Sequence, residues 1–372
     1  MSKKSLTIRF ELVLNHIIIE AKINAANYIK LTLDTGMPIG GIILFKNKKS
    51  ENSNLNYSGR AYVGGAGGNP ILADIASGVN VEIGDLQLAN RQIIVMPMNQ
   101  NVLTSLDSDG IIGYELFSRY LLQIDFEKKL IILWNNHNEE DVELGQELKL
   151  ELRQNYPFIQ CLAEITKGKE FPLDLVVDLG AGHAISLDLK SKDNFTLPEN
   201  TIECRIGTGT IGNIFGHLGR ISKFSMGNYS FSDVVTTFSN GPLARGFLKC
   251  NGNLGIDILR RFNVTFDYKS LKIYIKPNIH FNDHFVFNMT GLQFHKMDDG
   301  NFIVDNVINN SPAQEAGIIQ NDIIIEINDK TAKLVSADTL DKMIKKESTE
   351  LILVIMRNSE LLKLTLKLRP IL

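Results

Sequence analysis

The sequence is poor in cysteine, in basic clusters and in long apolar runs, and each shortage argues against a class of protein. Only three of the 372 residues are cysteine, an odd number without Cys-x-x-Cys spacing. A disulfide-stabilised scaffold needs paired cysteines. We therefore expect Cys161, Cys204 and Cys250 to be buried or surface thiols.

The composition indicates neither a membrane span nor a nucleic-acid partner. No stretch is long and apolar enough to cross a bilayer, and residues 6–14 alternate apolar with polar side chains where a signal peptide would have an apolar core. Basic residues form only short runs such as 46–49, and the net charge is −3. As it stands, the chain is expected in the cytoplasm, and it would be exported or periplasmic if a leader had been removed.

What the chain does contain is an internal duplication. Leu-Thr-Leu-Asp-Thr-Gly at 31–36 returns as Val-Val-Asp-Leu-Gly at 176–180, and Gly110–Phe117 returns as Gly252–Leu259. The offset stays nearly constant, since 178 − 34 = 144 and 255 − 113 = 142. A match held along the whole unit indicates two copies of one fold. Each copy delivers one Asp into a turn, so we expect one site made by two lobes.

Short alternating segments and glycine-rich turns predict strands in both copies, with little helical periodicity. We expect two β-barrels or sandwiches, the first lobe at 5–136 and the second at 146–278. The polar stretch 46–58 is predicted to be a loop, and 135–143 to be the linker between the lobes.

Each copy also has a glycine-rich segment that suits a hairpin tip. Glycines there allow positive φ and leave the backbone free to move. The residues expected in these tips are Gly64, Gly65, Ala66 and Gly67 in the first copy, and Gly207, Thr208 and Gly209 in the second.

The pattern changes near residue 285. Strands predicted at 323–327, 351–356 and 361–368 alternate with helices predicted at 311–317 and 337–346. This arrangement predicts a separate small α/β domain at 285–372.

The two copies resemble the aspartic peptidases of the retropepsin and pepsin clan. The resemblance rests on Asp34-Thr35-Gly36 after an apolar strand, the glycine-rich hairpin some thirty residues on, and Ile111-Ile112-Gly113. It implies a mainly β fold of two lobes, with Asp34 and Asp178 as the catalytic pair. Thr35, Gly36, Leu179 and Gly180 would support the two turns, although the family has Thr or Ser where this chain has Leu179.

The implied chemistry is hydrolysis of a peptide bond by an activated water. Two adjacent carboxylates share one proton, so that one serves as base and the other as acid. The hairpins would close over the substrate as flaps and exclude water. No cofactor or metal is expected, and the partner is a peptide or protein substrate of a monomeric enzyme.

The C-terminal segment resembles a PDZ domain, and the whole chain is similar to bacterial aspartyl-protease family proteins that carry one. Gly291-Leu292-Gln293-Phe294 corresponds to the carboxylate-binding loop, and Ser311-Pro312-Ala313 matches a further part of the bacterial pattern. The resemblance implies capture of a peptide by its C-terminal carboxylate, through strand addition. Leu340, Met343 and Ile344 would line the groove on the adjoining helix.

Four weaker signals are assigned structural roles. The GxGxxG run at 207–212 does not open a helix, as a dinucleotide fingerprint must. His280 and His284 have helical metal spacing but lie in a polar linker without a third ligand. His183 is expected near the surface or behind Asp178, and Ser311 is expected to be a helix N-cap.

Two rival interpretations stay open on the sequence. The protein could be a non-catalytic peptide-binding protein that keeps the cleft and the PDZ groove, because Leu179 removes one hydroxyl from the turns. Alternatively, one lobe could pair with the lobe of a second molecule.

Overall fold

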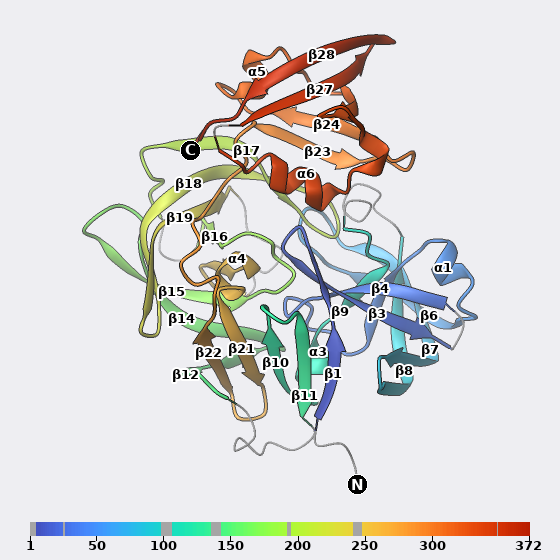
Figure 1. Cartoon of the computed structure of the whole chain (residues 1–372). Coiled ribbons are helices and arrows are strands. Elements are labelled where there is room, and N and C mark those ends of the chain that lie inside the picture. Colours follow the sequence, from blue (N-terminus) through green and yellow to red (C-terminus); the bar gives the residue numbers. More distant parts are fainter. Residues whose placement is uncertain are drawn as a thin grey trace.

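The computed structural model describes residues 5–24, 27–97, 106–134, 143–191, 195–240, 248–347 and 349–372. The fold class is confirmed: the protein is mainly β, with two barrel-like sheets and a small C-terminal α/β domain. Figure 1 shows the C-terminal domain, in orange and red, above the two lobes. The predicted linker between the lobes lies outside the described residues except for Glu143. In the part of the chain that is described, no helix has the length and apolar character to span a membrane.

The first lobe is one eight-stranded sheet that curls on itself. Strands in it alternate buried with exposed positions, which places one face of the sheet in the core. An additional β3–β7 pairing joins the two halves of the sheet. In spatial order the strands are β2 (Glu11–Val13), β3 (His16–Ile23), β4 (Asn27–Leu33), β9 (Gly110–Ile112), β5 (Ile42–Phe45), β8 (Leu86–Met96), β7 (Ile71–Ile83) and β6 (Asn56–Val63).

The second lobe repeats this strand order, as the duplication in the sequence predicts. Its additional pairing is β14–β18, which is equivalent to β3–β7. The spatial order is β13 (Glu151–Arg153), β14 (Tyr156–Glu164), β15 (Glu170–Val177), β20 (Gly252–Leu254), β16 (Ile185–Asp188), β19 (Tyr229–Ser239), β18 (Asn213–Met226) and β17 (Thr201–Thr208).

A six-stranded sheet joins the lobes. The central strands of the sheet are β10 and β21, which pair antiparallel with Gln123 opposite Thr265. These two residues are equivalent in the duplication, and Gln123 Nε2 donates to Thr265 Oγ1 at 3.2 Å. The local twofold between the lobes therefore passes through this pair. The six strands, in order, are β1 (Ser5–Arg9), β11 (Leu130–Trp134), β10 (Leu121–Asp125), β21 (Phe262–Asp267), β22 (Lys272–Pro277) and β12 (Gln146–Lys149).

The C-terminal domain has its own sheet and its own apolar core, which includes Phe302, Ile324 and Leu353. The strands are β23 (Leu292–Lys296), β24 (Phe302–Val307), β25 (Ile323–Ile327), β27 (Glu350–Arg357) and β28 (Glu360–Lys367) in spatial order, with β26 (Lys330–Thr331) beside β25. The helices are α5 (Pro312–Glu315), η3 (Ala332–Leu334) and α6 (Ala337–Met343).

The prediction of a loop over 46–58 is wrong in part. Lys48–Glu51 forms the one-turn helix α1, and β6 begins at Asn56. The cause is a capping box, in which Asn47 Oδ1 accepts from Ser50 N–H and the Ser50 hydroxyl accepts from Asn47 N–H. Two further short helices, α3 (Tyr114–Phe117) and α4 (Ile256–Leu259), follow Gly113 and Gly255, which are equivalent in the two copies.

Arg261, just after α4, is a fully buried cation that fixes the chain leading to the C-terminal domain. Its Nε donates to Asp257 O at 2.8 Å, and its Nη1 donates to the carbonyls of Phe281 and Asp283. The guanidinium also lies 3.8 Å from the centre of the Phe285 ring. Burial lowers the pKa of Arg261.

We expect Arg261→Ala to lower the free energy of unfolding by about 3 kcal/mol, because it leaves buried carbonyls without donors and opens a cavity. The matched control is Arg119→Ala at the equivalent position of the first lobe, since 261 − 119 = 142. The Arg119 side chain is 43% exposed and pairs with Glu115. That change should cost less than about 1 kcal/mol. Urea unfolding of both variants measures the difference, and equal losses would contradict the role given to Arg261.

Candidate functional site

The same local structure presents Asp34 and Asp178. Each follows the last residue of a strand, β4 or β15, that pairs in parallel with the apolar-apolar-Gly strand of its own lobe. Asp34 N–H donates to Ile112 O, and Asp178 N–H donates to Leu254 O, both at 2.9 Å. Both turns are thus fixed by backbone bonds that do not depend on which side chains surround them.

Thr35 links the two turns across the lobe interface. Its hydroxyl donates to Val177 O at 2.7 Å and accepts from Leu179 N–H at 2.9 Å. Thr35 is only 1% exposed, so both bonds are buried. One side chain of the first lobe therefore holds the backbone on both sides of Asp178.

Gly180 lies against the carboxylate of Asp34. A Cβ added to Gly180 would stand 2.3 Å from Asp34 Cγ, so only glycine fits. The Gly180 N–H also donates to Asp178 Oδ1 at 3.1 Å, and Gly36 N–H donates to Asp34 Oδ1 at 2.6 Å. The structure thus brings Asp34, Asp178, Gly36 and Gly180 together.

Leu179 stands in the second lobe at the position equivalent to Thr35. Its side chain is fully buried and belongs to the apolar core of the lobes. Thr35 thus contributes hydrogen bonds between the two turns, whereas Leu179 contributes apolar packing.

Two residues beside the Asp pair were not predicted to be site residues. Asn253, on β20, donates from Nδ2 to Asp178 Oδ2 at 2.8 Å, whereas the residue at this register in the first lobe is the apolar Ile111. The Asn253 Oδ1 is buried and has no partner among the residues that the structure describes. The signal was present in the sequence as a polar residue at an apolar position of the repeat.

Tyr268 is the second missed residue. It stacks on Phe117 with ring centres 5.5 Å apart and is 5% exposed. Burial raises the pKa of Tyr268 well above its usual range, and the nearby Asp34, Tyr114 and Asp178 raise it further. Tyr268 therefore stays a neutral phenol close to both carboxylates. The corresponding residue of the first copy is Phe126.

The two glycine-rich hairpins meet at their tips. Ile211 N–H donates to Ala66 O at 3.1 Å, and a Cβ on Gly67 would stand 2.0 Å from Gly212 O. Gly65 and Gly209 also lie against the opposite hairpin. Gly207 and Thr208 belong to strand β17 rather than to the tip itself. The tip of the second hairpin is 209–212, and we call β6–β7 and β17–β18 the flap hairpins.

A smaller hairpin, β2–β3, reaches from the first lobe to the turn of Asp178. Asn15 Nδ2 donates to Gly182 O at 3.1 Å, and the ring nitrogens of His16 lie 2.7 Å from Leu14 O and 3.2 Å from Gly180 O. The second lobe reciprocates, because Asn155 Nδ2 donates to Pro38 O at 3.0 Å. Each lobe thus contacts the Asp turn of the other.

Residues 289–368 match the PDZ domain family, which confirms the predicted peptide-binding module. None of the curated proteins matches the chain. The comparisons therefore define a protein with a C-terminal PDZ domain. What the two lobes can do has to be inferred from the geometry described above.

In the PDZ domain, Gly291 has φ +75° and leaves no room for a Cβ beside Ser311. Ser311 is the N-cap of α5, as predicted. The N–H of Leu292 donates to Thr290 Oγ1 at 3.0 Å. Leu340 and Ile344 are buried in the domain core, and Phe294 and Met343 pack half-buried against it.

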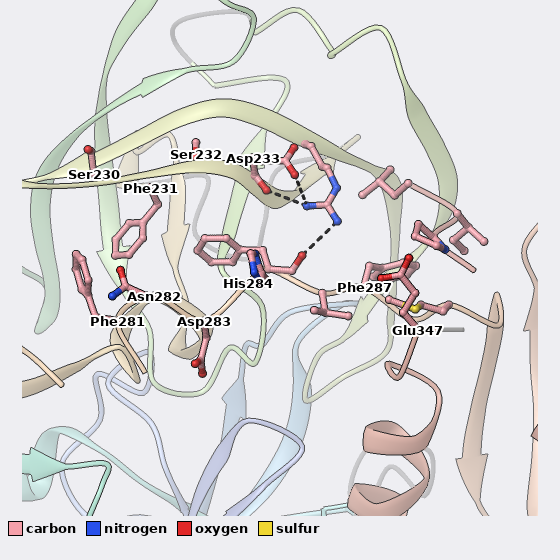
Figure 2. Close-up of a pocket in the computed structure, with 17 residues that line it drawn as sticks. Ser230, Phe231, Ser232, Asp233, Phe281, Asn282, Asp283, His284, Phe287 and Glu347 are labelled. Carbon is pink, nitrogen blue, oxygen red and sulfur yellow. Dashed lines mark hydrogen bonds and ion pairs between the residues drawn. The ribbon is translucent and has the colours of Figure 1, made fainter. Parts of the chain in front are cut away.

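A pocket of about 490 Å³ lies away from the Asp pair, between the second lobe, the chain at 281–289 and the C-terminal residues 370–372 (Figure 2). Arg220 spans it by donating to Asp233 and to Phe285 O. Among the described residues, no cluster of His, Cys, Asp and Glu is suited to hold a metal ion.

We expect Thr35→Val to lower the free energy of unfolding by about 3 kcal/mol, because Val177 C=O and Leu179 N–H would both lose a buried partner. Thr35→Ser keeps the hydroxyl and should cost less than half as much. Chemical denaturation of the two variants tests the assignment. A Val variant as stable as the Ser variant would show that the hydroxyl is dispensable.

From the burial of His16 we expect the stability of the protein to depend on pH. Burial lowers the pKa of His16 below 6.5, although Leu14 O, Gly180 O and the charge of Asp178 oppose the shift. The unfolded chain then binds more protons than the folded one just below pH 6.5, so stability falls as the pH drops through this window. His16→Gln should flatten the curve of unfolding free energy between pH about 7.5 and about 5, whereas His284→Gln in the exposed linker should leave it unchanged. Parallel curves for wild type and His16→Gln would contradict this prediction.

Proposed function

We propose that the two lobes form an aspartic-type endopeptidase in which Asp34 and Asp178 activate a water that attacks a peptide bond. The observation that carries the proposal is the hydrogen bonding of Thr35 to both sides of Asp178, with Asp34 held against Gly180. This geometry brings the two turns, and with them one carboxylate from each lobe, to the same place in the interface. A pair so placed shares a proton, which supplies a base and an acid at the same pH.

Asn253 supports a division of roles between the two carboxylates. An N–H donor favours the ionised form of a carboxylate. Asp178 receives such donors from both Gly180 and Asn253, whereas the first lobe has the apolar Ile111 at the position of Asn253. One carboxylate of the pair serves as the base that takes a proton from the water, and the other as the acid that protonates the carbonyl oxygen.

The flap hairpins support a substrate that lies between their tips and the Asp pair. Backbone contacts at glycine-lined tips can open and close without rearranging side chains. Closure would exclude water from the reacting amide. The PDZ domain would recruit peptide substrates or regulate the lobes by binding a C-terminal carboxylate.

A second candidate is a non-catalytic peptide-binding protein, which Leu179 favours. An apolar side chain in place of the family's hydroxyl leaves fewer hydrogen bonds to fix the angle between the carboxylates. Such a protein would bind peptides between the lobes and release them uncleaved.

If the pair is catalytic, Asp34→Asn and Asp178→Asn should each abolish cleavage of a mixed peptide library. Mass spectrometry of the library after incubation at pH values from about 3 to about 7 measures the cleavage. Stability should change little or rise, because one charge of a close pair is removed. Asp329→Asn, at a side chain 78% exposed, is the control that should keep full activity. Cleavage by either dyad variant at the wild-type rate would refute the assignment, and binding without cleavage by the wild type would favour the second candidate.

A further inference from the structure

Both walls of the PDZ groove are held by the lobes. In the PDZ domain a peptide adds to a free sheet edge beside a helix, and here β23 is the edge strand and α6 is the helix. Figure 1 shows the C-terminal domain with α6 and β23 on the side that faces the lobes.

The β23 wall is tied to a flap strand. Gln293 Nε2 donates to Arg205 O, and Arg205 Nη1 pairs with Asp305 on the neighbouring β24 at 2.8 Å. His295 also lies 2.7 Å from Asp305. Arg205 belongs to β17, which ends one residue before the flap tip at 209–212. The position of β23 is thus linked to the second flap hairpin.

The α6 wall is tied to the hairpin β2–β3. Leu14 N–H donates to Asp338 Oδ1, in the first turn of α6, at 3.1 Å, and the Leu14 side chain packs against the apolar core of the PDZ domain. Next along the chain, Asn15 and His16 contact Gly182 O and Gly180 O. Three consecutive residues therefore connect the groove helix to the turn that carries Asp178.

The duplication shows that Leu14 is specialised for this contact. The equivalent hairpin of the second lobe has Gln154 at the same turn position, with the same φ of 48°. Gln154 is exposed, whereas Asn155 keeps the contact to the opposite turn. Similarly, β17 is mostly half-buried, whereas the equivalent β6 is mostly exposed. The elements beside the PDZ domain thus depart from the repeat in what they contact.

The interface between the PDZ domain and the lobes is of a kind that permits the domain to move relative to the lobes. The pocket of about 490 Å³ lies along the same junction, where polar contacts such as Arg205–Asp305 stand beside a small apolar cluster around Cys204, Leu218 and Ile308. An interface of this kind between domains permits relative motion more readily than a packed apolar one.

We propose that the PDZ domain restrains the Asp178 turn and the second flap hairpin through Leu14 and Arg205, and that a peptide bound in its groove by a C-terminal carboxylate releases both. The contribution to catalysis rests on the proposed endopeptidase function, but the coupling between groove and lobes does not. Coupling of this kind is reciprocal, so weakening the restraint must strengthen peptide binding.

Peptide binding to the full chain tests the proposal. The probes are short fluorescent peptides ending in Val, Leu or Phe with a free carboxylate, each with an amidated copy. Leu14→Asp places a charge opposite Asp338 and removes the apolar contact, at a backbone position that Asp tolerates better than Leu. We expect it to bind the carboxylate peptides about tenfold more tightly than wild type. Arg205→Gln should act in the same direction from the other wall.

The matched controls are Gln154→Asp, at the equivalent hairpin tip, and Arg60→Gln, in the exposed strand β6. Both should bind the peptides like wild type. Hydrogen exchange of the folded full chain provides the second measurement. A bound carboxylate peptide should speed exchange of the backbone amides at 14–16 and 205–211, and its amidated copy should not.

Equal affinity of Leu14→Asp, Arg205→Gln and wild type would overturn the proposal, as would slower or unchanged exchange in both segments. Absence of carboxylate-dependent binding to every variant would overturn it as well. Neither measurement involves peptide-bond hydrolysis, so an inactive Asp pair would leave the result unaffected.

Discussion

The hydroxyl of Thr35 holds the two lobes together at the point where their Asp turns meet. It is the donor to one buried backbone group of the second lobe and the acceptor from another. Buried backbone groups need partners, and Thr35 provides one for each of these two. The relative position of Asp34 and Asp178, and with it any chemistry they perform, depends on this side chain.

Around that link the duplication provides symmetry, and a few substitutions in one copy break it. The shared sheet order, the paired contacts of Asn15 and Asn155, and the central Gln123–Thr265 pair are symmetric. Asn253 and Tyr268 are not, since the first copy has Ile111 and Phe126. Two identical carboxylates in identical settings would be equivalent. Polar groups present on one side only make them inequivalent, which is what separate acid and base roles require.

The PDZ domain extends this asymmetry to the outer elements. It contacts β17 but leaves β6 exposed, and it contacts Leu14 but not Gln154. Because the domain has its own core, its attachment to the lobes depends on a few polar contacts and small apolar patches. A peptide-binding module attached in this way can change its contacts without unfolding either part, which suits regulation.

The sequence alone determined the mainly β fold, the duplication, the two Asp turns and the PDZ domain, because each depends on local patterns: alternation along strands, glycine in turns and repeat spacing. Ser311 as an N-cap follows from the same local chemistry. The helix α1 was missed although its capping box was readable at Asn47 and Ser50. The tertiary structure alone decided which residues meet across lobes and domains. Thr35 hydrogen-bonds to Val177, which is 142 residues away in the sequence. Likewise, Asn253 hydrogen-bonds to Asp178 over 75 residues, and Leu14 to Asp338 over 324 residues. Such contacts depend on how whole sheets pack, and no local pattern in the chain encodes that packing.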